Sequence, residues 1–284
     1  MHLVTGAAGK TGRAVISALV ARSVPVRALV RHSTQRDAVE ALGADDVRIG
    51  DLRDGPTLST AMKGIESAYL ICPNVHPAEL EMVETAIGAA QSADLSRLVY
   101  HSVLHPQTNA MPHHWQKLLA EERLLEAPLS VTVLQPAPYQ QNLLAVWPDA
   151  EAGTYPVPYS PAARFSWVDL EDVSEVAARV LTESGHEDAI YELAGPAALD
   201  ADGVASAWAA ALGRPVGVER IDVDEWARDA RLTGYARHAL MAMFKYYDRN
   251  GLVGNPNVLK WLIGREPGGV EAFLTREAAR RVAR

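Results

Sequence analysis

The sequence contains one cysteine, Cys72, among 284 residues, and this scarcity excludes an internal disulfide framework and fits a reducing compartment. It lacks any apolar run of membrane-spanning length, and no N-terminal segment has the pattern of a signal peptide, so we expect a soluble cytoplasmic protein. Basic residues are also too few for general nucleic-acid binding. The formal charge is −8, whereas phosphate backbones require a cationic face.

Apolar runs typical of strands alternate with helical stretches over the first two thirds of the chain. Strands are expected at residues 2–5, 26–30, 47–50, 67–71, 97–102, 130–135 and 189–194. Helices are expected at residues 10–21, 36–42, 57–62, 77–92, 114–126 and 171–182. This order predicts an α/β fold of the Rossmann type, a doubly wound parallel sheet with helices on both faces. At 48% hydrophobic residues, the chain has enough apolar material for a sizeable core.

Three glycines, Gly6, Gly9 and Gly12, follow the first apolar run and precede the first helical stretch. A strand, a glycine turn and a helix N-terminus together form a dinucleotide-binding site, because the glycines admit the pyrophosphate and the helix offers N–H donors. The letters Gly9-Lys10-Thr11 also imitate the end of a P-loop, which needs a glycine five residues before Gly9. Val4 stands there, so we prefer the dinucleotide.

A cation ends the second predicted strand, where proteins that prefer NAD usually place a carboxylate for the ribose hydroxyls. The chain reads Arg31-His32-Ser33, with Arg36 close behind. Guanidinium groups bind phosphate oxygens strongly, so the sequence favours NADP(H). The alternative is a solvated basic loop, which would be an ordinary surface feature.

The regular alternation of strands and helices ends after Gly195. We expect a smaller C-terminal α+β lobe there, with a helix at residues 202–212, a strand at 216–221 and an aromatic helical segment at 224–247. We predict an NADP-binding domain over residues 1–155, with 165–195 returning to its sheet, and a substrate or partner lobe over 196–284. The proline-rich segment 145–163 is expected to be a loop.

Ligands of open α/β sheets lie at the carboxyl ends of the strands. The residues expected there are Asp51 and Leu52 after the third strand, Cys72, Pro73 and Asn74 after the fourth, Ser102 after the fifth, and Pro136 and Tyr139 after the sixth. Cys72 is interpreted as a packed residue rather than a nucleophile. The histidines His76, His101, His105, His113 and His114 do not have the spacing of a zinc site, so no metal is predicted.

The segments VRALVR, IGDLRD, VYHS, HHWQKLLAEERL and LQPAPYQQNL, in this order and with FSWVDLEDVSEVAARVL after them, resemble the NmrA-like family of atypical short-chain dehydrogenase/reductases. The resemblance covers nearly the whole chain. It implies a Rossmann domain, a small C-terminal lobe and NADP(H) in the cleft between them. Members include quinone and triphenylmethane-dye reductases as well as NADPH-sensing regulators.

The resemblance also implies roles for individual residues of this chain. The phosphates would be held by Gly6, Ala8, Gly9, Lys10, Thr11 and Gly12, and the 2′-phosphate by Arg31 and Arg36. Adenine would lie beside Asp51 and Leu52, and the ribose and nicotinamide along Cys72, Pro73, Asn74, Ser102, Lys117, Pro136 and Tyr139. Tyr139 and Asn142 would face the substrate. We also name His76, His113 and Trp147 as candidate substrate residues, although a tryptophan such as Trp147 is more often a packing residue.

One position departs from the catalytic short-chain dehydrogenases, in which a tyrosine precedes the active-site lysine by four residues and donates a proton. Here Lys117 is preceded at that spacing by His113. With an ordinary pKa of about 6.5 the imidazole is a candidate proton donor, and a loop or helix-cap role is the alternative. We name Lys117 and His113 as the candidate catalytic residues.

These observations predict an NADPH-dependent oxidoreductase that transfers hydride to a small conjugated or aromatic acceptor, such as a quinone or a dye. Delocalised acceptors need less help from an acid than carbonyls do. The alternative is a non-catalytic NADP(H)-sensing regulator that binds a protein partner, which the missing tyrosine favours. An epimerase would require the tyrosine. The oligomeric state is expected to be monomer or homodimer.

Overall fold

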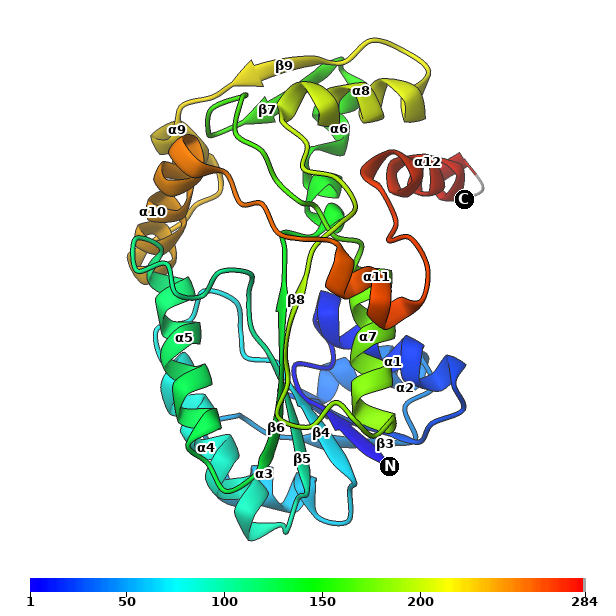
Figure 1. The fold of residues 1–284 in the computed structure, drawn as a ribbon, viewed down its shortest axis with the longest axis vertical. Helices are drawn as coiled ribbons and strands as arrows, with labels where there is room; N and C mark the ends of the chain where they lie inside the picture. Colours follow the sequence, from blue (N-terminus) through cyan, green and yellow to red (C-terminus); the bar gives the residue numbers. More distant parts are fainter. Residues whose placement is uncertain (283–284) are drawn as a thin grey trace. The chain divides into compact units, whose positions relative to one another are not determined.

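In the computed structural model, which describes residues 1–282, seven strands form one sheet in the order β3-β2-β1-β4-β5-β6-β8 (Figure 1). The strands are β1 (His2–Val4), β2 (Val26–Val30), β3 (Asp46–Ile49), β4 (Ser67–Leu70), β5 (Arg97–His101), β6 (Ser130–Pro136) and β8 (Ile190–Leu193). The pairs from β3 through β6 are parallel. The strand order reverses between β1 and β4, and such a switch point is where open α/β sheets bind ligands. The predicted Rossmann-type fold is confirmed.

Helices alternate with these strands along the chain and cover the sheet on both faces, as Figure 1 shows for α3, α4 and α5 opposite α1 and α2. Their bounds are α1 (Lys10–Ala21), α2 (Arg36–Glu40), α3 (Gly55–Met62), α4 (Glu79–Ser92), α5 (Pro112–Leu125) and α7 (Leu170–Thr182), with a 3-10 turn η1 at Ser33–Gln35. Both β2 and α1 have the predicted bounds. The core is built from the inward faces of these elements, including Leu3, Leu58, Met82 and Leu98, which are all almost fully buried.

The chain divides into two compact units. Unit 1 consists of residues 1–107, 113–135 and 173–191, and unit 2 of residues 108–112, 136–172 and 192–284, whose last two residues lie outside the described part. Within residues 1–282, no helix combines the length and apolar character needed to span a bilayer. Unit 1 thus carries most of the large sheet, and unit 2 is assembled from three separate segments.

Unit 2 is largely helical, with a two-stranded parallel sheet of β7 (Thr154–Val157) and β9 (Gly217–Arg220). Its other elements are the 3-10 helix η2 (Gln140–Val146), α6 (Trp147–Glu151), α8 (Ala201–Leu212), α9 (Val223–Asp229), α10 (Gly234–Asn250), α11 (Asn257–Ile263) and α12 (Val270–Val282). The prediction of a loop over 145–163 is therefore wrong in part, because this segment contains α6 and β7. Pro148 is tolerated in the first turn of α6, where its missing N–H needs no partner.

Candidate functional site

The glycine turn joins β1 to α1 and is packed against the chain that follows β4. Thr5 ties it there, because its hydroxyl donates to the carbonyl of Ile71 (3.1 Å) and accepts from the Ile71 N–H (2.8 Å). Gly6 has a φ of +55°, a left-handed conformation that favours glycine. A Cβ on Gly12 would lie 2.4 Å from the Gly6 carbonyl oxygen, so the turn closes too tightly for any side chain there.

The N-terminus of α1 suits a negatively charged group. Gly9 is its N-cap and supplies no side-chain cap, and the first turn contains no acidic residue. The helix dipole therefore meets no protein carboxylate in its first turn, and Lys10, exposed at the first position, adds a positive charge. Ala8 lies in the glycine turn before this helix, and Lys10 and Thr11 are its first two residues. The tight glycine turn and this helix end fit a dinucleotide pyrophosphate.

Arg31 lies at the carboxyl end of β2, beside the carboxyl end of β3. Its guanidinium Nε is 3.5 Å from Asp51 Oδ2, and its side chain is 61% exposed, so it remains open to a ligand. Asp51 is held mainly by Arg53, whose guanidinium and backbone N–H both donate to it. These hydrogen bonds, and the charges of Arg53 and Arg31, hold the pKa of Asp51 well below its usual range. Two arginines around one carboxylate leave a net positive charge.

Arg36 and Leu52, also predicted in this region, both make contacts that stabilise the fold. The Arg36 guanidinium donates to Glu40 (3.1 Å) and to the Val47 carbonyl (3.1 Å), which braces α2 against β3. Leu52 is buried in the same hydrophobic cluster as Leu29. Arg31 is therefore the better exposed of the two predicted 2′-phosphate arginines.

The segment after β4 contributes small and partly buried groups. Cys72 is buried, and desolvation, followed by the negative charge of Glu79, raises the pKa of its thiol to about 12. It is therefore a neutral thiol at physiological pH, which agrees with a packing role. Pro73 and Asn74 are exposed. His76 Nδ1 accepts the Ala78 N–H at 3.1 Å, so this histidine stabilises its own turn.

Lys117, on α5, has its ammonium fixed at the carboxyl end of β5. Nζ donates to Glu79 Oε1 at 2.6 Å and to the His101 carbonyl oxygen at 3.0 Å. Glu79, the first residue of α4, is 1% exposed and also accepts the Tyr100 hydroxyl at 2.7 Å. The ammonium lies 5.1 Å from the centre of the Tyr100 ring, an arrangement typical of a cation–π contact. The positive charge of Lys117 is thus paired with a buried carboxylate, and two of its three N–H groups have acceptors.

Ser102 follows β5 and faces a second buried carboxylate. Its hydroxyl donates a short hydrogen bond to Glu121, one helical turn beyond Lys117 on α5. Gln135 Nε2 donates to both Glu121 oxygens, at 3.1 and 2.9 Å. Burial raises the pKa of Glu121 above its ordinary value, although these hydrogen bonds oppose the shift.

Three histidines close to Lys117 are buried. Burial, then the charge of Lys117, lowers the pKa of His113 to about 4 and that of His101 to about 3. His114 also has a pKa of about 3, and its ring meets that of His113 edge to face. At neutral pH the His113 ring is therefore uncharged, so it offers a hydrogen bond rather than an imidazolium proton. Its Nδ1 is buried without a hydrogen-bond partner among the described residues.

Unit 2 contains the remaining predicted site residues. Pro136 is buried, Tyr139 is partly buried, and Asn142 is exposed. Trp147 has a packing role instead of the predicted exposure to substrate, because it is 2% exposed and its ring meets Trp208 edge to face at 4.9 Å. Its indole N–H donates to Glu151 at 2.8 Å. Burial thus removes Trp147 from the candidate site.

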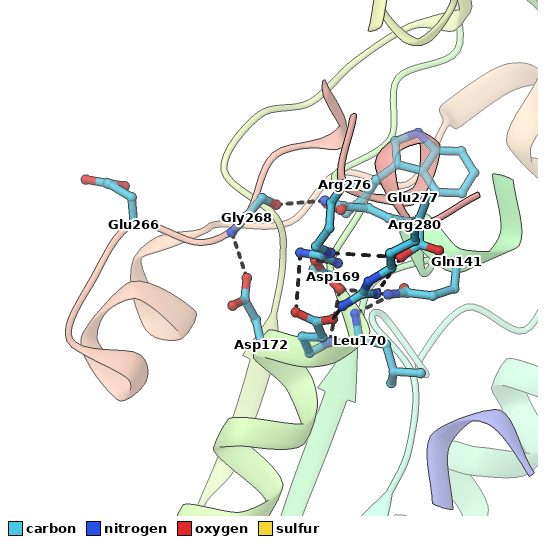
Figure 2. A network of polar contacts seen from close by, with 12 residues as sticks. Gln141, Asp169, Leu170, Asp172, Glu266, Gly268, Arg276, Glu277 and Arg280 are labelled. Carbon is cyan, nitrogen blue, oxygen red and sulfur yellow. Dashed lines mark hydrogen bonds and ion pairs between the residues drawn. The ribbon is translucent and has the colours of Figure 1, made fainter. Parts of the chain in front are cut away.

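A polar network in unit 2 fastens α12 and the chain before it to the start of α7 (Figure 2). Asp169, which is 2% exposed, accepts from Gln141 (2.7 Å) and pairs with Arg276 (2.7 Å). Asp172 accepts the Gly268 N–H at 2.7 Å. Its buried carboxylates are engaged by arginine, amide and backbone N–H donors, and we assign the network a structural role.

Several side chains that the sequence did not single out complete the lysine's surroundings. Glu79 and Tyr100 contact Lys117 or its partner, and Glu121 and Gln135 hold Ser102. Only Glu121 had a local signal, because its spacing of four residues from Lys117 places both on one helix face. Within residues 1–282, no group of three His, Cys, Asp or Glu side chains is arranged to hold a metal ion.

Comparison with known proteins identifies one family over nearly the whole chain. The model of the NmrA-like family matches residues 2–278. The chain is 32% identical to an NAD(P)H azoreductase of Xenophilus azovorans over 79% of this chain and 78% of that one. It is 28% identical to quinone oxidoreductase 2 of Escherichia coli K12 over 93% and 94% of the two chains. A crystal structure of an Escherichia coli NADPH-dependent quinone oxidoreductase complexed with NADPH superposes with a TM-score of 0.85 at 26% identity, covering 99% of this chain and 100% of that one.

Proposed function

Because this chain belongs to the NmrA-like family, we propose that it is an NADPH-dependent reductase of small conjugated acceptors such as quinones and azo or related dyes. The observation that carries the proposal is that unit 1 places the glycine turn, Arg31 and Lys117 at the carboxyl ends of its parallel strands. The relatives named as azoreductase and quinone oxidoreductase support the acceptor class.

The chain's own residues would divide the work as follows. The tight turn at Gly6 and Gly12 and the N-terminus of α1 hold the pyrophosphate. Arg31 binds the 2′-phosphate, and the ammonium of Lys117 binds a ribose hydroxyl. NADPH, when bound, supplies a hydride, and the reduced acceptor also takes up one proton, as when a quinone becomes a hydroquinone.

His113 is proposed as the group that polarises the acceptor. Its ring is neutral at physiological pH and has a buried nitrogen without a hydrogen-bond partner among residues 1–282. A hydrogen bond to the acceptor would satisfy that nitrogen, and the proton would come from water. Tyr139 and Asn142 of unit 2 stay predictions as further substrate residues.

A panel assay tests the proposal. NADPH oxidation is followed with quinones, azo dyes and triphenylmethane dyes, and the affinities for NADPH and NADH are titrated in parallel. We expect turnover with at least one acceptor class and a preference for NADPH. Binding without turnover on any acceptor would contradict the reductase and favour a sensor.

The cofactor preference has its own variant. Arg31→Ala should weaken NADPH by about tenfold to hundredfold and NADH little, since it removes a charge-assisted bond to the 2′-phosphate. Arg48→Ala is the matched control, because Arg48 is a comparably exposed arginine on β3 that pairs with Asp46. Equal losses for both cofactors in Arg31→Ala would refute the assignment.

A further inference from the structure

Lys117 and its surroundings support an inference about a residue on a different helix. Two elements of unit 1 fix the Lys117 ammonium from outside α5, namely α4 through Glu79 Oε1 and β5 through the His101 carbonyl. An ammonium has three N–H donors in a tetrahedral arrangement, so once two are directed, the third has one remaining direction. Among residues 1–282, no oxygen or nitrogen atom accepts that third N–H, and the centre of the Tyr100 ring lies 5.1 Å from Nζ.

Glu79 is itself held in place. It opens α4, is 1% exposed, and accepts the Tyr100 hydroxyl at 2.7 Å on the same oxygen that accepts from Lys117. The Lys117 side chain is only 12% exposed, so its charge would be costly to bury without this carboxylate. The pair therefore fixes both the position and the charge of the ammonium before any ligand arrives.

We infer that Glu79 is the positioning residue of this site, which orients the Lys117 ammonium so that its third N–H is presented to a ribose hydroxyl of the bound dinucleotide. The inference rests on the proposed function, because it assumes that a dinucleotide binds. Glu79 acts through Lys117 and touches neither cofactor nor acceptor.

Other titratable groups around the pair come from β5, from α5 and from the chain after β4. They are Tyr100, His101, His113, His114, Glu121 and Cys72. Glu79 and Glu121 carry the charge opposite to that of the ammonium, and the three histidines, whose pKa values are lowered to about 3 or 4, are uncharged at neutral pH. Glu79 makes the direct contact, so its removal changes the charge balance most.

The same two helices supply a matched control. Arg123 on α5 pairs with Glu84 on α4 at 3.3 Å, with both side chains about half exposed. Glu79→Gln and Glu84→Gln are therefore the same substitution on one helix, each facing a cation on the other helix. Only the first changes the surroundings of Lys117.

The test measures NADPH dissociation constants against pH for the wild type and both variants, with circular dichroism as the check of folding. Glu79→Gln should weaken NADPH about tenfold at neutral pH. Its alkaline loss of affinity should also begin at lower pH, because an unpaired buried ammonium gives up its proton more readily. KM for NADPH should rise while KM for the acceptor stays unchanged. Glu84→Gln should behave as the wild type.

A second readout needs no cofactor. Trace acetylation of Lys117 in the apoprotein, followed by mass spectrometry across pH, reports when the free amine appears. We expect it at lower pH in Glu79→Gln than in the wild type and in Glu84→Gln. Acetylation and affinity profiles that coincide in all three proteins would overturn the inference.

The outcomes separate the two proposals. A wild type that fails to bind NADPH refutes the proposed function, whatever the acetylation shows. A wild type that binds NADPH, with a folded Glu79→Gln of equal affinity and equal pH profile, refutes the positioning role alone. If Glu79→Gln does not fold, Glu79→Asp replaces it, since it keeps the charge and withdraws the carboxylate by one methylene. That variant should keep the wild-type pH profile with weaker binding, and unchanged binding would refute the inference.

Discussion

Mild acid should destabilise this protein through its buried histidines, and His114 is the clearest test. It is 1% exposed, and its Nδ1 lies 3.2 Å from the His105 carbonyl oxygen. Burial, and then the nearby charge of His113, lowers its pKa to about 3 in the folded protein. The unfolded chain takes up a proton near pH 6.5, so between about pH 6.5 and pH 3 unfolding is accompanied by proton uptake.

The sign and the size follow from this difference in pKa. A group whose pKa is lowered on folding contributes stability that is present above its unfolded pKa and is lost as the pH falls. Between pH 7 and pH 5 the unfolded histidine becomes almost fully protonated while the folded one does not, which costs about 2 kcal/mol of unfolding free energy per such residue. His101 and His113 are depressed in the same way and add to the slope.

Urea unfolding at pH 7 and pH 5 measures this contribution of the histidines to the unfolding free energy. His114→Asn should lower the stability at pH 7 and reduce the difference between the two pH values by about 2 kcal/mol. His238→Asn is the control, because His238 is exposed on α10 and the same substitution there leaves the core untouched. An unchanged pH difference in His114→Asn would refute the argument that this ring is kept neutral by burial.

Two further predictions concern the glycine turn and the network of Figure 2. Gly12→Ala should abolish NADPH binding and lower the melting temperature, because its Cβ would lie 2.4 Å from the Gly6 carbonyl oxygen; a variant with normal binding by fluorescence titration would contradict the turn's geometry. Asp169→Asn should lower the unfolding free energy by about 1.5–3 kcal/mol and speed hydrogen exchange in α12, since it removes a buried charge-assisted bond to Arg276. Glu171→Gln, at a half-exposed carboxylate that also contacts Arg276, should cost less than about 1 kcal/mol, and equal effects of the two substitutions would contradict a special role for the buried aspartate.

The elements that the sequence predicted well have local signals. The first strand, the glycine turn and α1 are contiguous, and their pattern depends on backbone sterics and helix amphipathicity alone. The segment 145–163 was mispredicted because four prolines within it indicate a loop. Prolines are compatible with the first turn of α6 and with β7, an edge strand of a two-stranded sheet, because fewer backbone N–H groups need partners there.

In the candidate site too, the sequence predicts only those residues that have a local signal. Lys117 and His113 could be found from a spacing of four residues. Glu79 could not, because its partner lies 38 residues away and a glutamate in the first turn of a helix is ordinary on dipole grounds. The neutrality of His113 likewise depends on burial, which no pattern within α5 discloses.

The lone cysteine has a practical consequence for experiments on this protein. Cys72 is buried and its thiol has a pKa of about 12, so maleimides and other thiolate-directed reagents should not react with it in the folded state. A single cysteine introduced at Trp261, which is 73% exposed on α11, would then be labelled alone without first removing the native thiol. A fluorophore or spin label at that position would follow unit 2 as cofactor is added, in an otherwise unmodified chain.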